Sequence, residues 1–174
     1  MPFDFNDINT NQFPVERQRM SNWCWAACTV SLCNFYARSE IFSQPQIVAR
    51  ILNMPGCNSS MPFPSCNKIF DFGLALNDVG HLDGNEVENP LSAGDLLNSL
   101  NRGRPIGCQM DIPQIGGHAV VIISGRSDNS GLLVLRVADP SDGSILTMSF
   151  VALRNNFRGL GGRWVRSYFT KPLD

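Results

Sequence analysis

The sequence predicts an α+β protein, with helices in the first part of the chain and an antiparallel sheet in the second. Before Gly103, apolar residues recur at helical spacing in several segments. After Gly103 the pattern changes to short apolar runs separated by Gly, Asp, Asn and Pro, which is typical of strands. We therefore predict a single domain, 1–174, with a helical part of about 18–103 and a sheet part of about 104–170.

Length and charge limit the classes of function. A chain of 174 residues is long enough for one domain with its own core and too short for two of ordinary size. A formal net charge of −1 gives no basic footprint for nucleic acid, and no apolar run approaches the roughly 20 residues of a membrane span. Residues 1–7 lack the basic and apolar regions of a signal peptide, although a cut inside a longer protein would leave the same start. We expect neither nucleic acid nor a membrane as partner.

The first predicted helix, 21–37, follows an irregular arm and presents a cysteine in its first turn. Ser21 is a suitable N-cap, which makes Cys24 the N3 residue. Unpaired N–H groups and the helix dipole place partial positive charge there, so a thiolate is favoured over a thiol. The pattern therefore predicts a nucleophile at Cys24, held on a helix with one apolar face.

Three further helices and five strands complete the prediction. A capping-box pattern with a proline in the first turn opens the second helix at Ser43. The helices are expected at about 43–53, 67–77 and 92–103, and the strands at 105–110, 119–124, 132–138, 145–150 and 164–169. We expect this sheet to pack against the first helix.

The six cysteines do not settle the redox state of the chain. Cys57 and Cys66 flank a loop rich in Pro, Ser and Asn that a disulfide would close easily, but spacing alone leaves free buried thiols as the simpler interpretation. No CxxC pair is present, and Cys24 and Cys28 lack a second close pair of ligands. We therefore expect no metal and no cofactor.

Two histidines are available as a base. His118 opens a buried strand after two glycines, whereas His81 lies in a polar turn and is expected to have no chemical role. Asp139 ends the next strand, where its carboxylate would accept the imidazole N–H. Asp-Pro is also ordinary turn chemistry, so the position of Asp139 after the histidine strand carries the argument.

These residues meet the needs of thiol acyl transfer. Such a reaction requires a thiolate, an imidazole that activates it and protonates the leaving group, and a group that orients the imidazole. It also requires donors for the developing oxyanion. Gln18, six positions before Cys24, could supply one donor, and the backbone N–H of Cys24 another.

The pattern resembles the papain-like cysteine proteases. Gln18 is followed six positions later by Cys24-Trp25-Ala26, then by Gly117-His118-Ala119 and by an acid ending a strand. The resemblance spans about 12–170, but identical motifs are confined to three short stretches. It implies a papain-like fold in which Cys24 is the nucleophile, His118 the base and acid, Asp139 the orienting group and Gln18 the oxyanion donor.

Some departures from papain indicate a particular branch. The histidine follows the cysteine by only 94 positions (118 − 24), Asn22 stands where a glycine is common, and the third residue is Asp139 rather than Asn. These features are similar to the AvrRpt2-like bacterial effector peptidases. That resemblance implies a secreted effector or interbacterial toxin delivered into a target cell, where it would act on a protein substrate. It also implies a neutralising immunity protein or inhibitor.

Three alternatives remain open at the level of sequence. A deamidase or a transglutaminase-like toxin would use the same Cys, His and Asp, with water or an amine as second substrate. A catalytically dead relative would only bind peptides, although all four site residues are intact. A peptidase that removes leader peptides after a double glycine shares the same groups, but Trp25 fits that branch poorly.

Overall fold

The computed structural model describes residues 12–173, so most of the predicted N-terminal arm lies outside the described residues. The helices are α1 (Cys24–Ala37), α2 (Gln44–Ile51), α3 (Phe72–Asp78), α4 (Ala93–Asn101) and α5 (Phe150–Asn155), with single 3-10 turns at Pro55–Cys57 and Pro64–Cys66. The strands are β1 (Ile106–Ile112), β2 (Gly116–Ser127), β3 (Leu133–Asp139), β4 (Ser144–Ser149) and β5 (Arg163–Phe169). Four of the five helices precede the strands, as predicted, and the α+β class is confirmed.

All five predicted strands are present in one antiparallel sheet, with the order β4-β3-β2-β1-β5. The register pairs Met110 of β1 with His118 of β2, and Asp139 of β3 with Ser144 of β4. His118 and Asp139 therefore lie on neighbouring strands, which is what the sequence pattern required of them.

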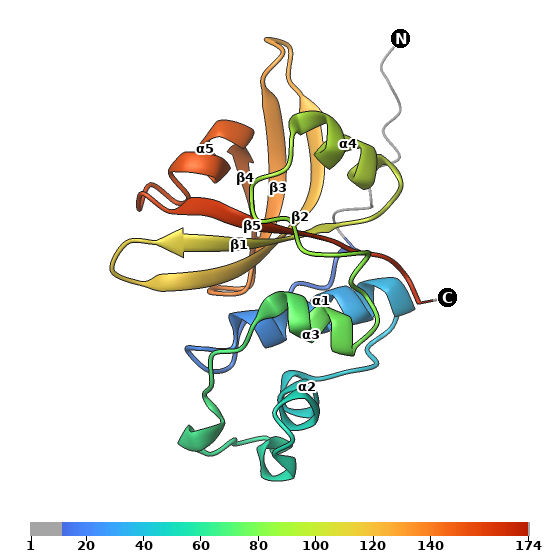
Figure 1. Ribbon diagram of the computed structural model, residues 1–174, viewed down its shortest axis with the longest axis vertical. Coiled ribbons are helices and arrows are strands. Elements are labelled where there is room, and N and C mark those ends of the chain that lie inside the picture. The colour runs from blue at the N-terminus through green and yellow to red at the C-terminus, as the bar shows by residue number, and fades with distance from the viewer. Residues whose placement is uncertain (1–11, 174) are drawn as a thin grey trace.

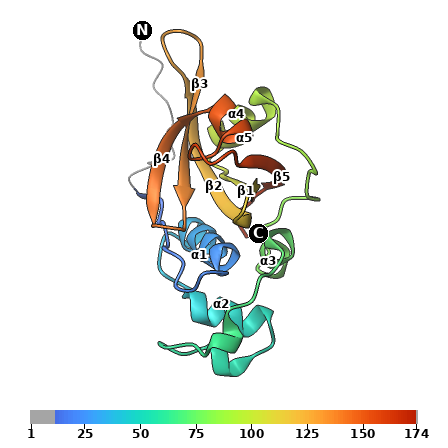
Figure 2. The same cartoon turned by 90° about the vertical axis from the view of Figure 1, so that its left-hand side faces the viewer.

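Helices cover both faces of this sheet. Figures 1 and 2 show α1, α2 and α3 below the sheet, and Figure 1 shows α4 and α5 above it. Alternate residues of β2 divide accordingly: Ala119, Val121 and Ile123 join the core cluster with α1, whereas Val120 and Ile122 join the second cluster with α4 and α5. The fourth predicted helix thus packs on the far face of the sheet rather than with the other helices.

Several predicted boundaries were wrong for local reasons. The third helix begins at Phe72 rather than near residue 67, because Asp71 is its N-cap and accepts a hydrogen bond from the backbone N–H of Leu74 at 2.8 Å. The last residue of the predicted 145–150 strand, Phe150, instead begins α5, which is capped by Ser149 and was not predicted. In contrast, the capping box at Ser43 and Gln46 is present as expected.

Cys57 and Cys66 form a disulfide, while the other four cysteines are free thiols. The interpretation of all six as free thiols was therefore wrong for this pair. Each of the two cysteines ends a 3-10 turn, and the turns bring the two residues together. Turns this short leave no periodicity in the sequence that would predict the pairing. Within residues 12–173, no helix is both long and apolar enough to cross a membrane.

Candidate active site

Cys24 is the first residue of α1, so it is the N1 residue of the helix, two positions earlier than the N3 position that the sequence predicted. Trp23, not Ser21, occupies the N-cap position, and no side chain caps the helix. The hydroxyl of Ser21 instead accepts a hydrogen bond from the Asn67 side chain at 2.8 Å. Cys24 is half-buried and keeps the free N–H groups of the helix start beside it, so the expected partial positive charge at the sulfur remains.

Two buried tryptophans anchor the backbone on either side of Cys24. Trp23 and Trp25 are almost fully buried, and each indole N–H donates to a carbonyl of the segment after the disulfide loop. Trp23 bonds the carbonyl of Cys66 at 2.9 Å and Trp25 that of Lys68 at 3.0 Å. Cys24 is therefore held between two fixed side chains. The sequence spacing of the tryptophans did not reveal this arrangement.

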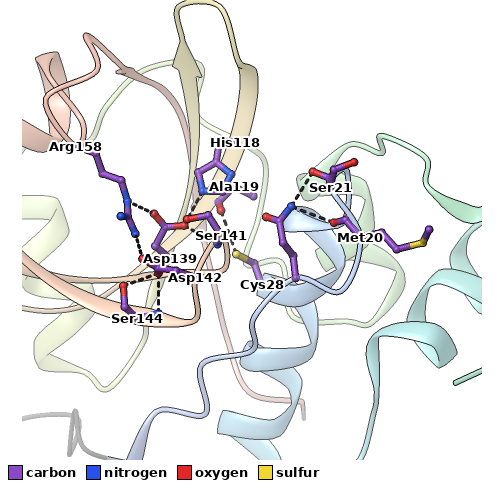
Figure 3. A network of polar contacts seen from close by, with 11 residues as sticks. Met20, Ser21, Cys28, His118, Ala119, Asp139, Ser141, Asp142, Ser144 and Arg158 are labelled. Carbon is purple, nitrogen blue, oxygen red and sulfur yellow. Dashed lines mark hydrogen bonds and ion pairs between the residues drawn. The ribbon is translucent and has the colours of Figure 1, made fainter. Parts of the chain in front are cut away.

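His118 and Asp139 form a short hydrogen bond at the seam between α1 and the sheet. Nε2 of His118 lies 2.7 Å from Oδ1 of Asp139, whose side chain has no exposed surface (Figure 3). The same oxygen accepts the backbone N–H of Ser141 at 2.9 Å. Since Nε2 faces Asp139, Nδ1 is the nitrogen left for Cys24.

The sulfur of Cys24 and the imidazole of His118 are hydrogen-bonded to each other, and both are ionised more readily for that reason. Burial raises the pKa of the Cys24 thiol, but the hydrogen bond to His118, together with backbone groups of Ala119 and Trp25, outweighs burial and lowers it overall. Burial lowers the pKa of His118, yet hydrogen bonds to Asp139 and Cys24 raise it to about 9. These two shifts favour a thiolate–imidazolium pair near neutral pH.

Asp139 remains a carboxylate in spite of its burial. Burial alone would raise the pKa of this group, but the hydrogen bond and the charge of His118 hold it well below its usual range. A second cation, Arg158, donates from Nε to the other oxygen, Oδ2, at 2.6 Å. Sequence reasoning missed this arginine, which lies in a glycine-rich turn with no recognisable motif.

The remaining free thiols are not suited to be the nucleophile. Cys28 lies one turn below Cys24, fully buried, and its S–H donates to the carbonyl of Ala119 at 3.4 Å. Burial raises the pKa of Cys28 and of Cys108 well above the usual value, and that of Cys33 to about 12. Only Cys24 combines partial exposure with a lowered pKa.

Gln18 is brought to the site by the chain before α1, but its amide is already occupied. The backbone N–H of Gln18 bonds the carbonyl of Pro140, one residue after Asp139, at 2.7 Å. Its Nε2 donates to the carbonyls of Met20 at 3.1 Å and Ser21 at 2.7 Å, and its buried Oε1 has no hydrogen-bond partner. Both amide hydrogens thus support the loop before Cys24, and donation to an oxyanion requires one of them to be released.

His81 lies away from this site, as expected, but it is not a surface loop residue. It is buried, its ring stacks on that of Tyr36, and Nδ1 lies 2.8 Å from the carbonyl of Lys171. Burial lowers the pKa of His81, which keeps it neutral in a structural role. Among the described residues, no cluster of three or more His, Cys, Asp or Glu side chains could hold a metal ion.

A half-buried thiol at a helix start, hydrogen-bonded to an imidazole that a buried carboxylate orients, is the site of the papain-like class of cysteine proteases. The family model described as papain-like cysteine protease AvrRpt2 matches residues 7–158 of this chain. The chain therefore belongs to the AvrRpt2 family of papain-like cysteine proteases. No curated protein sequence matches it.

Solved structures support the papain-like fold. Two crystal structures of the Amb a 11 cysteine protease in its proform, a major ragweed pollen allergen, are 16% identical to this chain, with TM-scores of 0.53 and 0.54. The alignments cover 95% and 97% of this chain but only 65% of each ragweed chain. The Pseudomonas avirulence protein AvrPphB is 14% identical over 92% of this chain and 98% of its own, and its TM-score of 0.44 is too low to establish a common fold.

Proposed function

We propose that this protein is a cysteine endopeptidase that cleaves a protein substrate through an acyl-enzyme. Cys24 is the nucleophile, His118 the general base and acid, Asp139 the group that orients the imidazole, and Gln18 an oxyanion donor. The observation that carries the proposal is the 2.7 Å hydrogen bond between Nε2 of His118 and the buried Asp139, on an imidazole that also interacts with the half-buried Cys24 thiol at the start of α1.

In the first half of the reaction, the thiolate of Cys24 attacks the carbonyl carbon of the scissile peptide bond. A C–S bond forms, and the carbonyl electron pair moves onto the oxygen, which faces the backbone N–H of Cys24 and one N–H of Gln18. As the intermediate collapses, His118 gives its Nδ1 proton to the leaving nitrogen and the C–N bond breaks. The products of this half are a free amine and a thioester on Cys24.

In the second half, neutral His118 takes a proton from water, which attacks the thioester carbon. The C–S bond then breaks, the acid product leaves, and the thiolate and imidazolium are restored. Asp139 stays a carboxylate throughout and keeps the same imidazole nitrogen, Nε2, directed to itself. The low pKa of Asp139 supports this role, because the group does not take the proton from His118.

A comparison of the wild type with Cys24→Ala in a target-cell lysate tests the proposal. We expect new N-termini that appear only with the wild type, and loss of all such cleavage in a variant that keeps the wild-type circular dichroism spectrum. Equal cleavage by Cys24→Ala would move the nucleophile elsewhere. Conversion of Gln to Glu in a lysate protein, with no new N-terminus, would identify a deamidase. If no lysate protein changes covalently, the domain would only bind peptides.

We further propose that the protein is secreted, as a bacterial effector or interbacterial toxin delivered into the cytoplasm of a target cell. The Cys57–Cys66 disulfide supports passage through an oxidising environment, where such bonds form and persist. Maleimide labelling of the protein from producing cells and from the medium tests this. A pair that is reduced in both fractions would argue against secretion.

An immunity protein or inhibitor of the producing cell is part of this second proposal. Such a partner would need to cover Cys24, since that sulfur is the reactive atom. Addition of the partner to the folded protein should therefore slow alkylation of Cys24 by iodoacetamide by tenfold or more, because nearly all of the protein is bound when the partner is well above its dissociation constant. An unchanged alkylation rate in a complex that forms would place the partner on another surface.

A further inference from the structure

Arg158 connects the catalytic carboxylate to a second acid. Its Nε donates to Oδ2 of Asp139 at 2.6 Å, and its Nη2 donates to Oδ2 of Asp142 at 2.9 Å. Figure 3 shows Arg158 and His118 on opposite sides of the Asp139 carboxylate. The two oxygens of Asp139 are thus divided between an imidazole and a guanidinium.

The turn that carries Arg158 is held in place by its own hydrogen bonds. The backbone N–H of Phe157 bonds the carbonyl of Gly162 at 3.0 Å, and that of Gly161 bonds the Asn156 side chain at 2.9 Å. Phe157 is fully buried with its ring centroid 6.2 Å from that of His118. Arg158 itself has a φ of 53°, a left-handed conformation that an L residue keeps only where the surroundings hold it. Its side chain is therefore presented to Asp139 from a fixed backbone.

The burial of Asp139 gives this contact an energetic role. Its side chain has no exposed surface, and a buried carboxylate is costly unless cations or hydrogen-bond donors accompany it. His118 is a cation only during part of the catalytic cycle, because it gives its proton to the leaving amine. While His118 is neutral, Arg158 is the cation that remains beside Asp139.

We infer that Arg158 is a positioning residue: it keeps Oδ1 of Asp139 directed at His118, shares the charge of that carboxylate, and so sets the pH range in which Cys24 and His118 form an ion pair. The inference rests on the proposed function for its catalytic consequence. The other titratable groups around the site are Cys28, on α1, which burial keeps as a thiol, and Asp142, on the β3–β4 turn.

The charge of Arg158 determines the sign of the effect. A guanidinium beside Asp139 offsets part of the negative charge that favours imidazolium at His118 and disfavours thiolate at Cys24. Replacement of Arg158 by Ala should therefore raise the pKa of His118 and the pKa of Cys24 together. We expect both to move up by roughly half to one pH unit, since the arginine is partly exposed and solvent weakens its charge.

Nuclear magnetic resonance measures the first of these pKa values directly, because the chain has only two histidines. Titration of the imidazole signals should show His118 shifted upward in Arg158→Ala, with His81 unchanged as an internal reference. Arg154→Ala, an exposed arginine on α5 that stacks on Phe150, is the matched control and should shift neither histidine. A His118 pKa that stays constant or falls in Arg158→Ala would overturn the inference.

Alkylation of Cys24 by iodoacetamide gives a second readout that needs no substrate. The midpoint of its rate against pH should move up in Arg158→Ala and by less in Arg158→Lys, whose ammonium can keep one charge but not both contacts. If Arg158→Ala fails to fold, Arg158→Lys decides, and an unshifted midpoint in that variant counts against the inference. A residue with only a structural role would lower the melting temperature and leave both midpoints in place.

These measurements separate this inference from the proposed peptidase function. If the His118 and Cys24 midpoints shift in the arginine variants but the wild type cleaves no protein, the inference about Arg158 stands and the peptidase proposal fails. If the wild type cleaves protein but the midpoints do not shift in the arginine variants, the peptidase proposal stands and the inference about Arg158 is wrong.

Discussion

At the scale of single residues, Asp139 is the most constrained group of the site. Its carboxylate accepts from His118, from Arg158 and from the backbone of Ser141, and its side chain is inaccessible to water. Two different properties therefore depend on it: the direction of the imidazole, and the stability of the imidazolium. Substitutions can separate the two, because Asn keeps the shape and loses the charge.

We expect Asp139→Asn to retain part of the activity and Asp139→Ala to lose on the order of tens-fold or more, since only Asn can still accept from Nε2. Hydrogen bonds to Asp139 and Cys24, together with the charges of these groups, raise the pKa of His118 to about 9, so removal of the Asp139 carboxylate in either variant should lower that pKa. The basic limb of kcat/KM should accordingly move to lower pH by roughly one unit or more. Asp111→Asn, at an exposed position of β1, is the control. If both Asp139 variants kept the wild-type pH profile of kcat/KM, Asp139 would not be the group that orients His118. Either Asp142 or no acidic residue would then have that role.

The proposed oxyanion role would give the Gln18 amide a second task. In the resting structure both of its N–H groups bond carbonyls of the loop before Cys24. The carbonyl of Met20 lies at the longer distance, 3.1 Å against 2.7 Å for Ser21, so that bond is the easier one to exchange for an oxyanion.

We expect Gln18→Ala to lower kcat/KM by roughly 10²-fold, the usual loss for one oxyanion donor. Alkylation of Cys24 involves no oxyanion, so its rate should stay within about threefold of wild type. A parallel loss in both assays would show that Gln18 acts only by holding the loop, and an unchanged kcat/KM would exclude it from the site.

The candidate site residues could be singled out from sequence because each carries its own chemical signal. Cys24 follows a helix-start pattern, His118 precedes an apolar strand, and Asp139 ends the next one. Arg158 carries no such signal, since an arginine in a glycine-rich turn is normally solvated. Its function depends on a turn 19 residues after Asp139 folding back onto it (158 − 139), which only tertiary structure reveals.

At the scale of elements, the start of α1 depends on neighbouring segments rather than on a cap of its own. No side chain caps the helix, and the backbone N–H and side chain of Asn22 both bond Asn67. The indoles of Trp23 and Trp25 bond the carbonyls that follow in the same segment. The sequence rule that places a serine at a helix start failed here. Hydrogen bonds to the neighbouring segment fix the start of α1 in place of a side-chain cap.

The disulfide beside this segment should contribute measurably to stability. Cys57 and Cys66 are separated by nine positions, and closing a loop of that length is worth roughly 2.5 kcal/mol through the unfolded chain. We expect the double variant Cys57→Ser/Cys66→Ser to melt roughly 5–10 °C lower than the oxidised protein. A reducing agent should cause the same loss in the wild type and no further loss in the double variant. Identical melting temperatures would mean that the loop is ordered without the bond.

Helix α5 shows why short elements escape prediction. Its six residues include Phe150 and Leu153, which pack into the cluster on the far side of the sheet. An apolar residue directly after a strand is easily assigned to that strand, as Phe150 was. Six residues are also too few to show the helical periodicity of apolar residues in the sequence. The five strands could be predicted because each contains apolar or β-branched residues bounded by turn-forming residues.

At the scale of the whole molecule, the sheet joins two apolar clusters that share no side chain. One cluster contains Trp23 and Trp25 with α1 to α3, and the other contains Trp164 with α4 and α5. The strand β2 contributes to both, through alternate residues. Because each cluster is completed by the same sheet, neither can be lost without exposing one of its faces.

We therefore predict a single unfolding transition, as expected of one domain. The tryptophans allow each half to be observed alone: Trp164→Phe leaves Trp23 and Trp25 as reporters, and the Trp23→Phe/Trp25→Phe variant leaves Trp164. In each variant, the urea midpoint of the fluorescence should equal the midpoint of the same variant's circular dichroism. A fluorescence midpoint displaced from the circular dichroism midpoint in either variant would divide the chain into two independently folding units.

The order of the site residues along the chain also has a consequence during synthesis. Cys24 leaves the ribosome 94 residues before His118 (118 − 24), and Asp139 and Arg158 follow later still. Until these later segments are made and docked, the sulfur has no imidazole to deprotonate it and remains an ordinary thiol. By the proposed mechanism, an unfinished copy therefore cannot cleave protein in the cell that makes it, and reactivity begins only when nearly the entire polypeptide is in place.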